Sequence, residues 1–151
     1  MSVLAAIAYD PTTAVTKATS AALAMTALDT SNLRCVFAAP ANGRVMVRLN
    51  GTIHGATTFP QVLLGVLEGS TVRARMAPNG YLNGTALATT FLKIEALIPI
   101  GGLTPGATYT WDAAYGVETL VASTGIKYGG PNNATTNDGF GAFIFEVWDT
   151  A

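Results

Sequence analysis

The feature that most constrains this chain is a pair of alternating runs on either side of a turn in residues 32–55. Every second residue is apolar in both runs, at positions Leu33, Cys35, Phe37, Val45, Val47 and Leu49. This period-2 pattern predicts two consecutive half-buried strands. Between them lies Pro40-Ala41-Asn42-Gly43, where the chain is expected to turn back, because Asn-Gly favours positive φ and proline cannot continue a strand ladder.

Similar signals recur along the rest of the chain. Strands are expected near residues 18–26, 60–68, 72–77, 91–100, 107–116, 117–127 and 139–148. Gly69-Ser70 predicts a tight hairpin, and Pro99 suggests that its strand ends at a sheet edge. Residues 14–31 also fit a helical face, but their threonine content favours a strand followed by a turn at residues 29–31.

About eight strands without βαβ alternation predict an all-β fold. We expect one antiparallel β-sandwich, jelly-roll-like, over residues 14–151. Residues 1–13 are apolar but too short to form a core, so we expect an extended N-terminal arm that docks on this subunit or a neighbour.

Composition restricts the setting in which the protein works. Charged residues make up 11% of the 151 residues and hydrophobic residues 50%. A surface so poor in charge favours burial by other subunits in an assembly. The net charge of -1 argues against nucleic-acid binding, and no apolar run approaches the roughly 18–20 residues of a membrane span. The N-terminus lacks the basic start of a signal peptide, which favours synthesis in the cytoplasm.

The sequence contains few residues that could serve as a nucleophile or bind a catalytic metal ion. Cys35 and His54 are the only residues of their types, so neither a disulfide nor a zinc shell can form within the chain. We interpret Cys35 as a small buried residue and His54 as a structural or surface histidine. No metal or other cofactor is expected.

A pair of carboxylates is the remaining catalytic option. Glu95 and Glu146 both fall on expected strands and could serve a glycosidase, although solvated or arginine-paired side chains explain them better. We therefore interpret the protein as a non-enzyme.

Aromatic residues offer a binding platform as an alternative to core packing. Tyr109, Trp111 and Tyr115 alternate along one strand face, which favours a core or a subunit interface. Tyr81 lies between two Asn-Gly pairs, in an expected exposed loop, and is the best single candidate for contact with another molecule.

Six segments carry a further signal: residues 19–23 (TSAAL), 28–34 (LDTSNLR), 37–48 (FAAPANGRVMVR), 63–67 (LLGVL), 102–112 (GLTPGATYTWD) and 127–132 (KYGGPN). Together they resemble a β-sandwich of virion proteins from tailed phages, especially those of actinobacteria, and the similarity covers roughly residues 15–149. Residues 140–145 (FGAFIF) are more distantly similar to the last strand of the trimeric C1q and tumour-necrosis-factor jelly rolls.

This resemblance implies a virion setting. We expect a capsid decoration protein, made in the host bacterial cytoplasm, that forms a homotrimer on the capsid surface and contacts the major capsid protein. The arm would make that contact through Val3, Leu4, Ile7 and Tyr9. The alternative is a receptor- or glycan-binding protein of the tail fibre or tail tip, which would use Tyr81 and residues 129–138.

Overall fold

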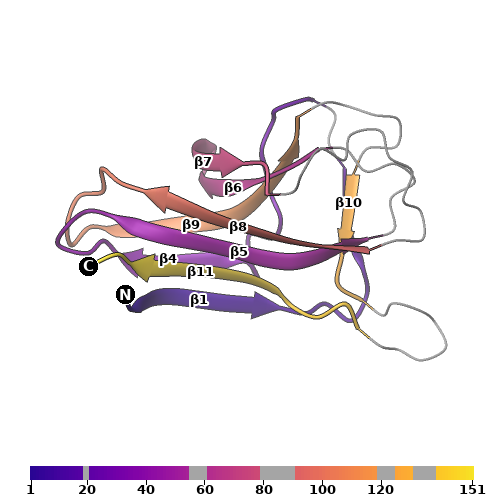
Figure 1. The fold of residues 1–151 in the computed structure, drawn as a ribbon, viewed down its shortest axis with the longest axis horizontal. Helices are drawn as coiled ribbons and strands as arrows, with labels where there is room; N and C mark the ends of the chain where they lie inside the picture. Colours follow the sequence, from indigo (N-terminus) through magenta and orange to yellow (C-terminus); the bar gives the residue numbers. More distant parts are fainter. Residues whose placement is uncertain (19–20, 55–60, 79–90, 119–124, 131–138) are drawn as a thin grey trace.

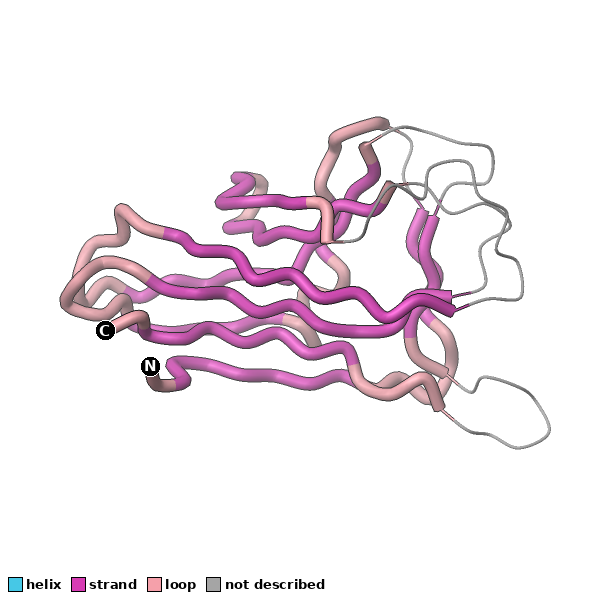
Figure 2. Tube along the Cα trace, viewed as in Figure 1, coloured by secondary structure: helices cyan, strands magenta, loops and turns pink. Residues whose placement is uncertain are grey.

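The computed structural model is an all-β sandwich (Figures 1 and 2). It describes residues 1–18, 21–54, 61–78, 91–118, 125–130 and 139–151. The described residues form eleven strands: β1 (Val3–Tyr9), β2 (Val15–Ala18), β3 (Thr26–Ala27), β4 (Arg34–Ala38), β5 (Val45–His54), β6 (Val62–Glu68), β7 (Thr71–Met76), β8 (Phe91–Ile100), β9 (Thr108–Val117), β10 (Gly125–Tyr128) and β11 (Phe143–Asp149). None of these residues belongs to a helix that could span a membrane.

Two antiparallel sheets make the sandwich. Sheet A has the order β1-β11-β5-β8, and β10 and β2 extend it beside the end of β5. Sheet B has the order β4-β9-β6-β7, and β3 lies beyond β4 on the same side of β9. The eight longer strands have the order of a jelly roll, with β1, β5, β8 and β11 in sheet A and β4, β6, β7 and β9 in sheet B. Seven of these eight were expected as strands, whereas β1 was expected as an arm, and the described residues form eleven strands instead of about eight. Most of the strand expected near residues 117–127 lies outside the described residues, and β10 forms at its end.

Residues 32–55 form both expected strands, but the strands belong to opposite sheets. β4 pairs with β9, whereas β5 pairs with β8 and β11. At the turn between them Gly43 has φ 62°, and its N–H donates to Pro40 O at 2.9 Å. The turn therefore carries the chain from one layer to the other, which places the apolar sides of β4 and β5 in the same core.

The core consists of the inward positions that alternation predicts. Its largest fully buried side chains are Trp111, Tyr115, Tyr128, Phe143, Phe145, Leu28, Leu33, Leu49, Ile53, Leu64 and Ile94. The expected hairpin at Gly69 joins β6 to β7, and β8 lies at an edge of sheet A among the described strands, as Pro99 suggested. Tyr109 is half-buried against this core, and Trp111 stacks edge-on to Phe37 with ring centroids 4.7 Å apart.

The expected strand near residues 18–26 is wrong. The chain forms β2 before this segment and β3 at its end, and residues 21–25 lie over the outside of sheet B. Gly65 and Gly116, which lie on neighbouring strands, make room for Met25, because a Cβ at either position would come within 3 Å of its side chain. Leu23 N–H donates to Val117 O at 2.7 Å and holds the segment there.

The N-terminal segment docks on its own subunit as an edge strand. β1 pairs with β11 from Val3 to Tyr9 and lies beside it in Figure 1. Leu4, Ile7 and Tyr9 pack against the core, whereas Val3 points outward and is 48% exposed. Residues 3–9 are therefore part of the sandwich, because a strand with one apolar side is stabilised by pairing and by burying that side.

Candidate assembly surface and pockets

The outside of sheet A exposes apolar side chains from four adjacent strands. The pairing register places Val3 of β1, Trp148 of β11 and Met46 of β5 in one row across the sheet. Leu97 of β8 lies in the neighbouring row, where it pairs with Arg48 of β5. Leu97 is 54% exposed, and Met46 and Trp148 are half-buried. We call this surface the sheet A face and define it by Met1, Val3, Met46, Arg48, Glu95, Leu97, Glu146 and Trp148.

A small hollow lies within the sheet A face. Met1, Met46, Leu97 and Trp148, with Arg48, line a pocket of about 200 Å³. This volume suits one side chain of a partner. That side chain would be apolar, because four of the five lining residues are hydrophobic.

The charged side chains on this face form ion pairs with one another. Arg48 Nε donates to Glu95 Oε1 at 2.9 Å, and Arg48 Nη1 lies 3.5 Å from Glu146 Oε2. Asn50 Nδ2 donates to the other oxygen of Glu95 at 3.0 Å, and Trp148 Nε1 donates to Glu146 at 3.1 Å. The hydrogen bond from Arg48 lowers the pKa of Glu95, so the carboxylate stays charged. The two carboxylates considered above for catalysis thus flank one guanidinium.

The outside of sheet B is less uniform. Its exposed Val36 on β4 and Val72 on β7 are separated by an ion pair of Arg34 with Asp112. Arg34 donates to both oxygens of Asp112, at 2.7 and 2.9 Å, and the Asp112 side chain is only 4% exposed. Leu23, which is 47% exposed, also lies over this side of sheet B. Both sheets therefore expose apolar residues, and on sheet A the pairing register places them on four adjacent strands.

His54 and Cys35 both have partners within the fold. His54 Nε2 lies 3.0 Å from Gly129 O, and its ring stacks on Phe140 with centroids 4.0 Å apart. Burial lowers the pKa of His54, while burial raises the pKa of Cys35 to about 12. The Cys35 thiol donates to Phe145 O at 3.6 Å. Across the described ranges, no three His, Cys, Asp or Glu residues gather where they could hold a metal ion.

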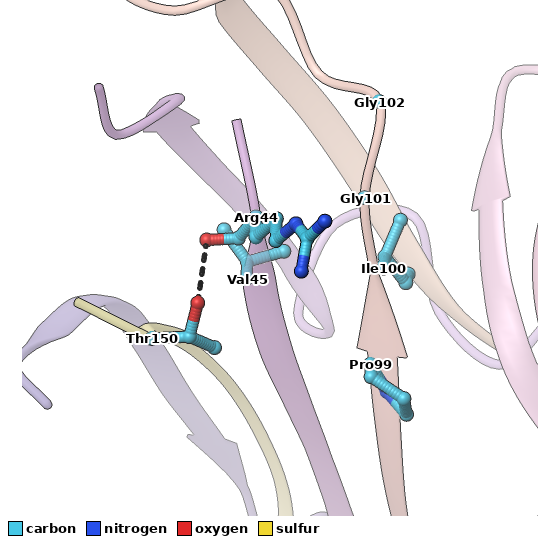
Figure 3. Close-up of a pocket in the computed structure, with 7 residues that line it drawn as sticks. All are labelled: Arg44, Val45, Pro99, Ile100, Gly101, Gly102 and Thr150. Atoms are coloured by element: carbon cyan, nitrogen blue, oxygen red, sulfur yellow. Dashed lines mark hydrogen bonds between the residues drawn. The ribbon is translucent and has the colours of Figure 1, made fainter. Parts of the chain in front are cut away.

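A second pocket lies where β5 begins and β8 ends. Its volume is about 390 Å³, and Arg44, Val45, Pro99, Ile100, Gly101, Gly102 and Thr150 line it (Figure 3). The Arg44 guanidinium points toward the end of β8, and Thr150 Oγ1 donates to Arg44 O at 3.3 Å. Sequence reasoning missed this pocket, because it forms between segments far apart in the chain.

The four arm residues singled out from the sequence divide between two sides of β1. Of the four arm residues, Val3 alone joins the sheet A face, and Leu4, Ile7 and Tyr9 serve the core. Tyr81 and most of the 129–138 loop lie outside the described residues. The alternation around Ala96 and Ile98 was a signal for an outward Leu97, but the pattern could not show that Trp148 and Met46 lie near it.

No protein-family model matches the chain, and no curated protein matches its sequence.

Proposed function

We propose that this chain is a non-enzymatic structural protein of a phage virion, a capsid decoration protein. In this proposal it forms a homotrimer on the capsid surface and stabilises the shell by contact with the major capsid protein. The observation that carries the proposal is the sheet A face, where apolar side chains from four strands surround charges that are already paired. Such a surface can be covered without isolating a charge in an apolar interface.

Two features of the sequence support the same conclusion. The charged share of 11% is less than half that of an average soluble protein, which suits a chain whose surface is covered by neighbours. The segments that resemble phage virion sandwiches also span most of the chain.

The contact surface differs from the one expected from the sequence. Leu4, Ile7 and Tyr9 contribute to the chain's own core, so they are not free to lie along a shell. The proposal therefore moves the contact to the sheet A face, with Val3 as the residue common to both. Burying the exposed halves of Val3 and Leu97 would stabilise by about 1 kcal/mol each before ordering costs, and symmetry repeats the gain in every copy.

A matched pair of substitutions tests the surface. Leu97 is 54% exposed on sheet A and Val36 is 56% exposed on sheet B, so Leu97→Lys and Val36→Lys add the same charge at equally exposed strand positions. We expect Leu97→Lys to abolish binding to purified capsids and trimer formation in analytical ultracentrifugation, whereas Val36→Lys retains both. Equal behaviour of the two variants, or loss with Val36→Lys alone, would refute the proposed surface.

The virion setting is tested by counting copies. Quantitative mass spectrometry of purified virions should give a number of copies close to that of the major capsid protein. A few copies per particle would contradict decoration and assign the chain to the tail. A glycan array with a Tyr81→Ala control would then test the receptor-binding alternative. Absence from the particle would reject both.

A further inference from the structure

Arg44 differs from the other arginines in how its guanidinium is used. The chain has five arginines. Arg34, Arg48 and Arg73 each bind a carboxylate, and Arg75 donates to Leu23 O. Within the described part of the chain, the Arg44 guanidinium has neither an acidic partner nor a carbonyl acceptor, and its side chain borders the 390 Å³ pocket (Figure 3).

The walls of this pocket are fixed by hydrogen bonds on both sides. Leu103 N–H donates to Gly43 O at 3.1 Å, which holds the segment after β8 against the start of β5. On the other side, Asn42 Nδ2 donates to Thr150 Oγ1 at 3.4 Å, and that hydroxyl donates to Arg44 O. The pocket is therefore built by paired backbone segments.

The lining combines one cation with apolar and bare backbone surface. Pro99 supplies an exposed hydrophobic side chain, and Gly101 and Gly102 expose backbone without a side chain. Val45 and Ile100 border the pocket but are only 1% and 8% exposed and belong to the core. A guanidinium offers a planar fork of N–H donors that fits a carboxylate in a bidentate way. The apolar surface of Pro99 suits the short stem that carries such a group. A single cation would leave a doubly charged phosphate undercompensated.

We propose that this pocket binds a carboxylate on a short apolar stem, as found on an acidic side chain or at the carboxyl terminus of a protein chain. The carboxylate pairs with the Arg44 guanidinium, and the stem lies against Pro99. This site adjoins the sheet A face, since Pro99 pairs with Met46, but it does not depend on the proposed function.

The test follows the backbone amides of Gly101 and Gly102 by NMR during titration with small probes. N-acetylvaline carries a terminal carboxylate, and the α-amide of N-acetylglutamate carries a side-chain carboxylate. N-acetylvalinamide and the α-amide of N-acetylglutamine are their neutral counterparts. We expect saturable shifts with at least one carboxylate probe and none with the neutral probes. The carboxylate probe with the lower Kd then shows whether the pocket prefers a terminal or a side-chain carboxylate.

Variants show whether Arg44 is responsible. Arg44→Ala should raise the Kd about tenfold or more, because it removes charge-assisted hydrogen bonds, while Lys93→Ala removes one charge elsewhere and should leave the Kd unchanged. Gly101→Leu keeps Arg44 but fills the pocket, since a Cβ at residue 101 lies 3.7 Å from Arg44 Cγ, and it should also abolish the shifts.

Three results would overturn the proposal. They are equal shifts with neutral and charged probes, an unchanged Kd in Arg44→Ala, and tighter binding of inorganic phosphate than of either carboxylate.

Discussion

Replacing Ile7 by alanine tests whether the N-terminal segment is a strand of the sandwich. Ile7 lies on the inward side of β1, opposite Phe145 of β11, and packs against the core. A fully buried Ile→Ala change costs about 2–5 kcal/mol, and because Ile7 is only half-buried we expect about half of this, roughly 1–2.5 kcal/mol. For a chain of this size, that corresponds to a fall in Tm of about 2–10 °C.

The matched control is Val3→Ala on the same strand. Val3 points outward and is 48% exposed, so its truncation should change the free energy of unfolding by no more than about 0.5 kcal/mol. Urea unfolding followed by tryptophan fluorescence gives both values, since Trp111 is fully buried. If Ile7→Ala were as stable as the unchanged protein but failed to bind capsids, the segment would be an arm and β1 would not contribute to the fold.

Three further outcomes follow from the packing. Gly116→Ala should lower the free energy of unfolding by about 1–3 kcal/mol, because its Cβ would displace Met25, whereas Gly101→Ala should be nearly neutral in the same urea experiment. Cys35, with a pKa raised to about 12 by burial, should react with iodoacetamide at pH 8 only after unfolding; modification of the native protein, detected by mass spectrometry, would contradict its buried position. Burial lowers the pKa of His54 from 6.5, so folding favours the neutral ring. The stability that the neutral ring contributes is present above pH 6.5 and is lost as the pH falls through the lower pKa of the folded state. Urea titrations between pH 7 and 5 should therefore show a steeper loss for the unchanged protein than for His54→Gln, and parallel curves would contradict this assignment.

Alternation along the chain predicted the strands but not their partners. β8 begins and ends where the sequence indicated, and the alternating apolar residues of β4, β5 and β11 are buried. Period 2 reports which side of a strand is buried, and it contains no information on which strand lies beside it. The turn at Gly43 therefore predicted a change of direction but not a change of sheet.

The failure at residues 18–26 has a different cause. Alanine and threonine fit several backbone conformations, so local preference there is weak and tertiary contact decides. The groove that receives Met25 exists only because Gly65 and Gly116 lie diagonally across paired strands, where each leaves room for the Met25 side chain. The candidate surface was hidden for the same reason, since Val3, Met46, Leu97 and Trp148 become neighbours only through pairing of β1, β11, β5 and β8.

The pairing of the first strand with the eleventh also constrains how the chain can fold. β1 pairs with β11 in sheet A, and β11 is one of the last described segments to be synthesised. The backbone hydrogen bonds between the two strands therefore cannot form until β11 has been made. Contacts between residues so distant in sequence require closure of a long loop and slow the folding of all-β proteins. On the ribosome, β4 to β9 can assemble first, while the apolar side of β1 stays uncovered. Folding intermediates of this protein should therefore be prone to aggregation through β1 until β11 is released.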